Sequence, residues 1–458
     1  MLIEADSNPS VLSLGKCSDQ MRQGLASLGV AWSDGSDLAD ADVVLVHYWN
    51  TPAMQRFVRS AHPPVRVVVW LMVEGGTRPN VITPELAAFA DVLMATSSST
   101  LSLPYVKERS ALYIPPPVDL ASFWPRPPIK ETPFRVGYLG TVDFVKMHPD
   151  YVAMSAAVPD EDVRFCVWGF GNAYAALKGE AARLKQEHRF QFHGTTEDAA
   201  AAFASMHVYG YPLCEDSYGT CDRSMQEAMA MALPSVVLDR PGLRDLAIDG
   251  VTALVARSAQ DYAAAIMQLK HDPDLRMRLG RSAQDHVRLH FEPGSIMGRL
   301  CRTLTDALSM PKRARKALDA GLPITGARLF VASLGHLAGE YARDLCSFEG
   351  RRANEGELID DEQAIAAATP GLCNPGAGGI LSYRAAYPGD PVLRFWSGLI
   401  FSHQGRHAVA LAEFLAALQL GVPKKRLEPH LAPAGRHCGL SDGAIADYAS
   451  QEAGAVLP

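Results

Sequence analysis

The sequence predicts an α/β protein with two doubly wound, Rossmann-like domains, followed by a domain built only of helices. Short apolar runs alternate with helix-like patterns as far as about residue 310, which is typical of parallel sheets. The stretch 115–128 (PPPVDLASFWPRPP) divides this region, because proline suits neither a central strand nor a helix interior. Beyond residue 326 the patterns are helical. We therefore expect domains over residues 1–125, 126–310 and 326–458.

The first region should hold a sheet with ligand sites at the carboxyl ends of its strands. Its strands are expected at the buried apolar runs 10–14, 43–47, 65–72 and 92–95. Its helices are expected at the periodic stretches 18–28 and 51–61. Two segments that follow strands, 47–50 (HYWN) and 74–77 (EGGT), are therefore candidate ligand sites. Glu74 is a candidate because Gly75 and Gly76 let a ligand approach the backbone. His47 fits better as a hydrogen-bonded histidine at a strand end.

The second region is centred on residues 211–237 (YPLCEDSYGTCDRSMQEAMAMALPSVV). A short strand closes at 211–213, the segment 214–222 is polar and loop-like, and 223–233 contains helix formers that end at Pro234. A loop that enters a helix N-terminus is a natural seat for phosphate. One turn into this helix, Glu227 can accept hydrogen bonds from both hydroxyls of a ribose.

Upstream, three further strands are predicted to end in glycine-containing turns. The strand at 134–139 leads into Gly140 and Thr141, with Lys146 shortly after. The strand at 164–168 ends in a G-x-G pair, which by itself is a weak indication of nucleotide binding. The strand that begins at residue 190 ends at His193 and Gly194.

These motifs resemble those of a known enzyme family. Residues 227–237 (EAMAMALPSVV) resemble the E-A-M-A-x-G-x-P-V-V signature of retaining GT-B glycosyltransferases of family 4, and residues 249–255 (DGVTALV) resemble its D-G-x-x-G-x-L-V. The resemblance extends over about 134–304. It implies transfer of a sugar from a nucleotide-diphosphate sugar, with UDP or GDP as the expected nucleotide, to an unidentified acceptor held by the first domain. It also implies retention of configuration, with no cofactor and no metal.

The resemblance assigns roles in donor binding. Lys146 would neutralise the leaving diphosphate, as fixed cations do in such reactions. Thr141 stands where the family has an arginine, and Arg223 is the candidate that replaces it. Glu227 would hold the ribose, and the backbone near His193 and Gly194 the base. The remaining donor contacts would come from Gly140, Thr141, Tyr218, Gly219, Thr220 and Ser224.

The residue that would contact the sugar stays open. The family has a glutamate eight residues before the one at Glu227, but Gly219 occupies that position. Residues 218–220 (YGT) instead resemble a variant branch, which makes Asp222 or Glu215 the candidate carboxylate, unless none is present. Asp222 has a plainer interpretation as a helix cap. Lys146 and Arg223 have one too, as solvated surface residues.

The C-terminal region resembles one tetratricopeptide unit at 391–424, with small and aromatic residues at the characteristic positions Gly398, Phe401, Gly405, Ala410, Phe414 and Ala417. Helices are also expected at 327–346 and 361–368. This region can present a protein acceptor, mediate self-association or brace the fold. The connector 311–316 (PKRARK) is expected to be basic and exposed.

The departures of this sequence from the family pattern suggest an alternative function. A degenerate GT-B protein acting as a scaffold through its C-terminal helices would explain Thr141, Gly219 and Ala232, which replaces a usual glycine. Retention of Lys146 and Glu227 favours the enzyme.

Composition narrows the classes of function and location. The chain has 458 residues, of which 48% are hydrophobic and 20% charged, as in soluble globular proteins. A net charge of −7 argues against nucleic acid as the main partner. Eight cysteines without a C-x-x-C pair suit reduced thiols. With no signal-peptide pattern and no apolar run long enough for a transmembrane segment, a cytoplasmic location is expected.

Overall fold

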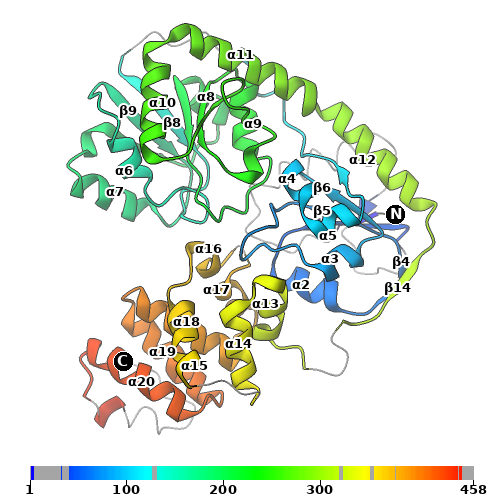
Figure 1. Ribbon diagram of the computed structural model, residues 1–458, viewed down its shortest axis with the longest axis vertical. Helices are drawn as coiled ribbons and strands as arrows, with labels where there is room; N and C mark the ends of the chain where they lie inside the picture. The colour runs from blue at the N-terminus through cyan, green and yellow to red at the C-terminus, as the bar shows by residue number, and fades with distance from the viewer. Residues whose placement is uncertain are drawn as a thin grey trace.

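The computed structural model describes residues 41–125, 132–318, 323–350, 355–376, 378–441 and 443–445, together with the backbone of strands β1 (Leu2–Glu4) and β2 (Trp32–Ser33). The chain forms three parts, two built on parallel sheets and one of helices (Figure 1). The strand expected at 10–14 and the helix expected at 18–28 lie outside the described residues. In the part of the chain that is described, no helix is both long and apolar enough to span a bilayer.

The first part contains a parallel sheet with the strand order β2-β1-β3-β5-β6-β7. Its later strands are β3 (Val43–Tyr48), β5 (Val67–Leu71), β6 (Val92–Ala95) and β7 (Leu112–Tyr113). The helices are α2 (Pro52–Arg59), α3 (Pro84–Phe89), α4 (Ser98–Ser102) and α5 (Pro104–Glu108). The predicted strands at 43–47 and 92–95 are confirmed, and every residue of β3 and β5 is buried, as predicted for this kind of sheet.

The second part contains another parallel sheet, with the strand order β10-β9-β8-β11-β12-β13. Its strands are β8 (Phe134–Leu139), β9 (Val163–Trp168), β10 (Phe190–Gly194), β11 (Val208–Tyr211), β12 (Ser235–Leu238) and β13 (Leu254–Ala256). The helices are α6 (Tyr151–Ala156), α7 (Tyr174–Arg183), α8 (Ala199–Ala204), α9 (Arg223–Ala230) and α10 (Ala259–His271). This is the strand order of dinucleotide-binding folds, and its direction changes between β8 and β11, where ligands bind.

Helix α9 ends three residues earlier than predicted, at Ala230. Ala232 adopts a left-handed backbone conformation with φ of 56°, which ends the helix before Pro234. Glycine is favoured at such a position because an L side chain there costs roughly 1–2 kcal/mol. The left-handed conformation explains why the family signature has glycine where this chain has alanine.

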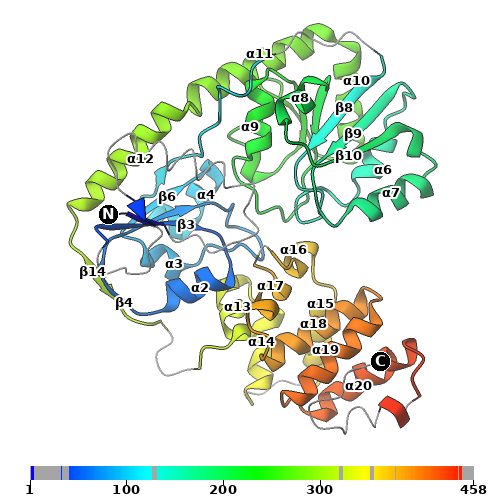
Figure 2. The same ribbon diagram turned by 180° about the vertical axis from the view of Figure 1, so that it is seen from behind.

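Two helices connect the second part back to the first. Helices α11 (Pro273–His290) and α12 (Pro293–Leu308) form an arc along the outside of both sheet-containing parts (Figure 2). Strand β14 (Arg313–Arg315) then pairs antiparallel with β4 (His62–Val65) at the edge of the first part. The run 65–72, predicted as one strand, is therefore divided between β4 and β5.

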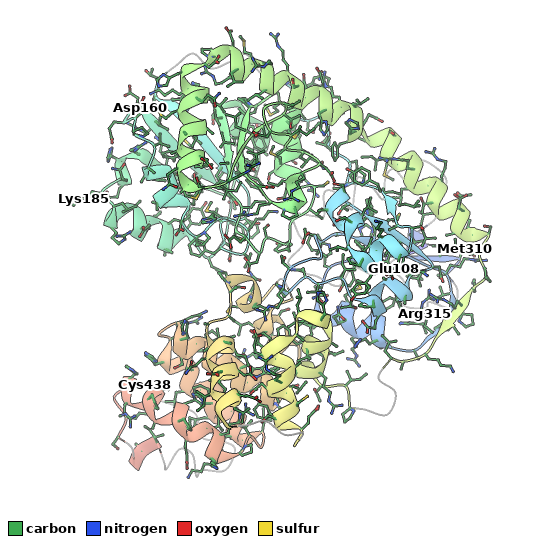
Figure 3. The ribbon with its side chains drawn as sticks, in the orientation of Figure 1. Glu108, Asp160, Lys185, Met310, Arg315 and Cys438 are labelled. Carbon is green, nitrogen blue, oxygen red and sulfur yellow. The ribbon has the colours of Figure 1, made fainter. Side chains whose placement is uncertain are left out.

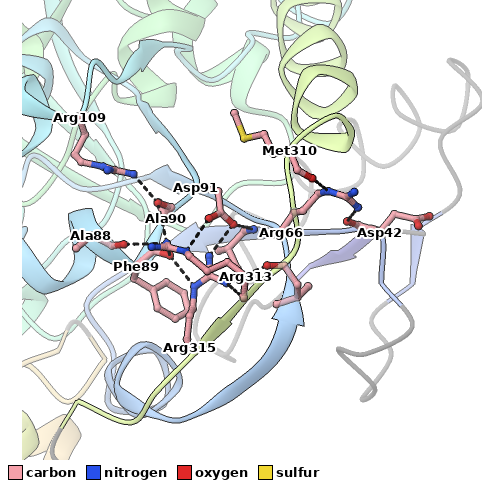
Figure 4. Close-up of polar contacts among 12 residues, drawn as sticks. Asp42, Arg66, Ala88, Phe89, Ala90, Asp91, Arg109, Met310, Arg313 and Arg315 are labelled. Carbon is pink, nitrogen blue, oxygen red and sulfur yellow. Dashed lines mark hydrogen bonds and ion pairs between the residues drawn. The ribbon is translucent and has the colours of Figure 1, made fainter.

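The connector 311–316 is not the fully exposed basic segment that was predicted. Arg315 is buried, and its Nη2 lies 2.7 Å from Oδ2 of Asp91. Arg313 Nε lies 3.1 Å from Oδ1 of the same carboxylate (Figure 4). The prediction failed because the charge pattern of the segment does not reveal its acidic partner in the first part, Asp91.

The third part is a helical module, defined here as residues 326–445. Its helices are α13 (Gly326–Leu334), α14 (Gly339–Phe348), α15 (Glu355–Ala366), α16 (Pro370–Cys373), α17 (Ile380–Ala386), α18 (Pro391–His403), α19 (His407–Gln419) and α20 (Lys424–His437). It has a hydrophobic core of its own. The single helix expected at 327–346 is broken at Gly335 and Gly339, whose φ values are 52° and 42°.

Helices α18 and α19 pack against each other within the window that resembles a tetratricopeptide unit. A Cβ atom on Gly398 would lie 2.4 Å from the ring of Phe414, so only glycine permits this spacing. The close packing agrees with the expected role of a small residue there, while the tetratricopeptide identity of the unit stays a prediction.

Candidate active site

A cavity of about 620 Å³ lies where the three parts of the chain meet. The second part lines it with the turns after β8, β9 and β10 and with the loop that enters α9, which are the segments at the point where the strand order changes direction. Ligands bind at this place in open parallel sheets. The predicted residues on its wall are Gly140, Thr141, Lys146, Tyr218, Gly219, Thr220, Asp222, Arg223 and Ser224.

Lys146 and Asp222 form an ion pair in this wall. Lys146 Nζ lies 2.8 Å from Asp222 Oδ1, and the two side chains are only 17% and 5% exposed. The hydroxyl of Tyr211 donates a hydrogen bond of 3.2 Å to the other carboxylate oxygen of Asp222. Asp222 occupies the N-cap position of α9, but its side chain makes no cap bond there, so capping does not account for this carboxylate. Lys146 is likewise not a solvated surface lysine.

The surroundings of Lys146 keep it charged. Burial by itself lowers the pKa of the ammonium group, but the Asp222 carboxylate and the Tyr218 hydroxyl outweigh burial and raise that pKa above its ordinary value. The ammonium also lies 6.0 Å from the centre of the Tyr218 ring. Because an ammonium has three N–H donors, the bond to Asp222 leaves donors for a phosphate.

Gly219 is explained by its distance from Asp222. A Cβ atom at position 219 would lie 2.7 Å from Asp222 Oδ1. A glutamate at this position, as in the family pattern, would therefore displace the carboxylate that pairs with Lys146. The glycine at position 219 therefore leaves the space that the Asp222 carboxylate occupies.

The loop turns sharply between Thr220 and Asp222. Cys221 adopts a left-handed conformation with φ of 48°. Its amide N–H donates to the carbonyl of Gly242 at 3.0 Å, and its thiol donates to the carbonyl of Thr96 in the first part at 2.8 Å. This buried turn fixes the loop against both sheet-containing parts and places the residues on either side of it on the cavity wall.

The N-terminus of α9 also faces the cavity, through Arg223 and Ser224. Ser224 Oγ accepts a hydrogen bond of 3.0 Å from the hydroxyl of Tyr209. Glu227 lies one turn further along the same helix, is half-buried, and does not line the cavity. The helix thus offers its positive end and one arginine to the space beside Lys146.

The G-x-G pair after β9 is required by close packing against the turn after β8. A Cβ atom on Gly169 would lie 1.7 Å from the carbonyl oxygen of Gly140, and one on Gly171 would lie 2.1 Å from that of Val142. Both glycines also have φ values, 139° and 152°, that disfavour other residues. The pair shapes the wall by letting two turns approach each other.

His193 and Gly194, the candidates for base binding, lie outside the cavity wall. The ring of His193 stacks on Trp168 with 4.3 Å between ring centres. Burial lowers the pKa of His193, which keeps its ring neutral. The carbonyl of Gly194 accepts from the amide of Gly169 at 2.7 Å. Both residues therefore adjoin the G-x-G turn.

Three other candidates do not reach the wall. Glu74 is buried, and its carboxylate accepts from the amide of Gly76 at 2.8 Å, which makes it a structural partner of its own loop. Burial raises its pKa. Glu215 is exposed and lies outside the wall. His47 is buried, as expected of a histidine at a strand end, and its ring centre lies 5.4 Å from that of Trp70.

The cavity wall includes residues that the sequence did not single out. The carboxylate of Asp143 accepts from the amide of Val145 at 3.2 Å, and its backbone carbonyl accepts from the amide of Lys146 at 3.0 Å, so Asp143 shapes the turn that carries Lys146. Its position between Thr141 and Lys146 could have suggested it. Trp49 and Asn50, also on the wall, belong to the predicted candidate segment 47–50. Further wall residues that the sequence did not single out include Thr51, Met72 and Asn80 in the first part and Asn374, Pro375 and Gly376 in the helical module.

Comparison with known proteins agrees with this geometry. Residues 133–272 match the model of the family described as glycosyl transferases group 1. No curated protein matches the chain. The match covers the second sheet-containing part and includes the turn of Lys146, the loop of Asp222 and helix α9. This part is therefore a glycosyl transferases group 1 domain.

Solved structures share the arrangement of the two sheet-containing parts. Anabaena HepE in complex with UDP-glucose is 15% identical, with a TM-score of 0.52, over 67% of this chain and 99% of that chain. Sucrose-phosphate synthase from Thermosynechococcus elongatus is 20% identical, with a TM-score of 0.50, over 64% of this chain and 78% of that chain. The chain thus has the GT-B glycosyltransferase fold, and about a third of it lies outside the match to HepE.

Proposed function

We propose that the protein is a glycosyltransferase of the retaining, metal-independent kind, which transfers a sugar from a UDP- or GDP-sugar to an acceptor. Residues 126–310 bind the donor and residues 1–125 contribute to acceptor binding. The observation that carries the proposal is the convergence of Lys146, Arg223 and the N-terminus of α9 on one cavity. A leaving diphosphate gathers negative charge, and fixed cations with a helix N-terminus stabilise it.

We propose two tasks for the ion pair. Asp222 holds the Lys146 ammonium at 2.8 Å, so the cation is already in place before the donor arrives. The remaining donors of the ammonium then bind the diphosphate, while Asp222 accepts a hydrogen bond from the sugar. The family resemblance gives the ribose to Glu227 and the base to the turn at His193 and Gly194, and these residues adjoin the cavity without lining it.

The nucleotide is proposed to be uridine diphosphate on the strength of one neighbour. HepE, whose fold this chain shares, was solved with UDP-glucose. The enclosure of the cavity by three parts of the chain would exclude water, which would otherwise hydrolyse the donor. Assignment to family 4 and retention of configuration rest on the resemblance of residues 227–237 to that signature.

A catalytically inactive scaffold is the second candidate, and one observation favours it. The charge of Lys146 is compensated by Asp222, and Thr141 supplies no cation where the family has an arginine, so the wall carries less positive charge beside the diphosphate position than the family pattern implies. This balance weakens nucleotide binding relative to a site with two free cations.

The two candidates are separated by nucleotide binding. Thermal unfolding would be measured with UDP, GDP, ADP and dTDP and their common sugar conjugates, on the wild type, Glu227→Ala and a control, Glu108→Ala. Glu108 is exposed on α5 in the first part (Figure 3). At a nucleotide concentration of about 100 times Kd, binding stabilises the folded state by about 2.7 kcal/mol.

We expect one nucleotide to stabilise the wild type and the Glu108 variant but not the Glu227 variant. Release of that nucleotide from its sugar conjugate would then be followed by chromatography. No stabilisation by any nucleotide would refute the enzyme and leave the scaffold.

A further inference from the structure

The helical module supplies part of the cavity wall. Asn374, Pro375 and Gly376, in the segment between α16 and α17, line the same cavity as Lys146 and Asp222. On the basis of the proposed glycosyltransferase function, we propose that the segment 374–376 is an acceptor-positioning wall. The acceptor that it helps to orient is an uncharged, polyhydroxylated group, a sugar residue at the end of a glycan or glycoside.

The segment is held in place by close contacts with both other parts. A Cβ atom on Gly378 would lie 1.8 Å from the carbonyl oxygen of Asn50, directly after β3 in the first part. A Cβ atom on Gly371 would lie 3.1 Å from Oδ2 of Asp216, in the loop that leads to α9. The segment between these glycines therefore spans the boundary between the acceptor side and the donor side of the cavity.

The module is anchored mainly to the acceptor side. Helices α13 and α17 pack against α2 of the first part, to the left of it in Figure 1. Arg78 Nη1 lies 2.6 Å from Glu340 Oε1 of α14, and its guanidinium lies 5.8 Å from the ring centre of Tyr341. Since these contacts all fall on the first part, the segment 374–376 keeps its place relative to the acceptor.

The groups on the acceptor side suit sugar hydroxyls. The first part and the module together present one indole and two carboxamides, from Trp49, Asn80 and Asn374. The carboxamide of Asn50 is used within the first part, by the carbonyl of Pro79 and the side chain of Gln55. A carboxamide both donates and accepts hydrogen bonds, as a sugar hydroxyl does. An aromatic ring adds an apolar surface for the carbon-bound face of a sugar ring.

Asn374 is the module's donor in this set. Its Oδ1 accepts a hydrogen bond of 2.6 Å from the amide of Gly376, which fixes the orientation of the carboxamide. The side-chain oxygen is thus used within the segment, and the NH2 group serves as the donor to a ligand. The ligand must therefore offer a hydrogen-bond acceptor, which a sugar hydroxyl does.

The test compares donor use with acceptor use in the full-length chain. The variant Asn374→Asp keeps the oxygen that accepts from Gly376 and removes the NH2 donor. The matched control, Gln419→Glu, makes the same amide-to-carboxylate exchange at an exposed position of α19 in the same module. With the nucleotide sugar that stabilises the wild type, nucleotide release would be measured without acceptor and with a panel of methyl glycosides, disaccharides and a mixed peptide library.

We expect the wild type to glycosylate at least one glycoside. Asn374→Asp should raise the KM for that acceptor about tenfold, as expected for the loss of one hydrogen bond to a ligand. The KM for the donor and the acceptor-free release of nucleotide should stay unchanged, and Gln419→Glu should match the wild type. Pro375→Arg, which adds bulk at an exposed residue of the wall, should disfavour disaccharides more than methyl glycosides.

Three results would overturn the proposal. The first is an unchanged acceptor KM in Asn374→Asp, and the second is an unchanged preference among acceptors in Pro375→Arg. The third is a wild type that releases nucleotide but glycosylates only peptides. Absence of donor binding and of nucleotide release in the wild type would instead refute the proposed function, and this inference with it.

Discussion

Replacing Lys146 by methionine tests the ion pair in the cavity wall. Lys146 Nζ and Asp222 Oδ1 are 2.8 Å apart, and the carboxylate is only 5% exposed. At an effective dielectric constant of about 20, their attraction is roughly 6 kcal/mol, much of which offsets the loss of hydration. Removal of the lysine alone leaves a buried carboxylate without its cation. We expect the free energy of unfolding of the second part to fall by about 3 kcal/mol.

The double variant Lys146→Met/Asp222→Asn separates charge from packing. Neutralising Asp222 removes the uncompensated charge, so most of the lost stability should return, to within about 1 kcal/mol of the wild type. Lys185→Met serves as the control, since Lys185 is exposed at the outer surface of the second part (Figure 3). Its stability should equal that of the wild type.

Urea and thermal unfolding followed by tryptophan fluorescence would measure the effect. A loss of about 3 kcal/mol lowers the Tm of a domain of this size by roughly 6–12 °C. Both variants that lack Lys146 should also lose stabilisation by nucleotide. A wild-type Tm in Lys146→Met would refute the coupling to Asp222. Undiminished nucleotide binding by the double variant would refute the role of Lys146 as a diphosphate ligand.

Three further outcomes follow from other features. Ala232→Gly should raise the free energy of unfolding by about 0.5–1 kcal/mol in urea titrations, because φ at this position is 56°, and any loss would contradict the account of the end of α9. Asp91→Asn leaves the buried Arg315 without a charged partner, so the free energy of unfolding should fall by about 3 kcal/mol and hydrogen exchange at β14 should become faster. Unchanged exchange would show that the ion pair does not hold the strand. Burial lowers the pKa of His286 below its ordinary value of 6.5, despite a hydrogen bond to the carbonyl of Asp245 that raises it. The unfolded state therefore binds a proton first, so this contribution to stability is present above pH 6.5 and is lost as the pH falls through the folded-state pKa. His286→Gln should make the decline of the urea midpoint between about pH 7.5 and about pH 5.5 shallower, and an identical slope would contradict the assignment.

The part of the cavity wall that the second sheet-containing part supplies was largely predictable because its determinants are local in sequence. Strand, glycine turn and helix N-terminus follow one another within short stretches, so residues such as Lys146 and Arg223 could be placed at one sheet edge without coordinates. The residue that pairs with Lys146 was a harder inference, because Asp222 at the start of a helix reads equally well as a cap.

The wall that the helical module supplies could not be predicted in the same way. The segment 374–376 reaches the cavity only because the helical module docks on α2, and that docking depends on contacts such as Arg78 with Glu340 that leave no periodic pattern. The burial of Arg315 was hidden for the same reason. A basic run looks solvated until the position of Asp91 is known. Tertiary packing decides which side chains of distant segments become partners, and these partners cannot be inferred from patterns in a single sequence.

The pairing of β14 with β4 has a consequence for the order in which the chain can fold during synthesis. The first part is discontinuous, since β4 receives its neighbour from residues 313–315, after the whole second part has been made. Until Arg315 leaves the ribosome, the edge of β4 lacks this partner and Asp91 lacks this cation. Domains otherwise tend to fold as they emerge, with the N-terminal one first. Here the N-terminal domain completes its structure last of the two, so a nascent chain of this protein carries β4 as an unpaired strand until residues 313–315 have been made.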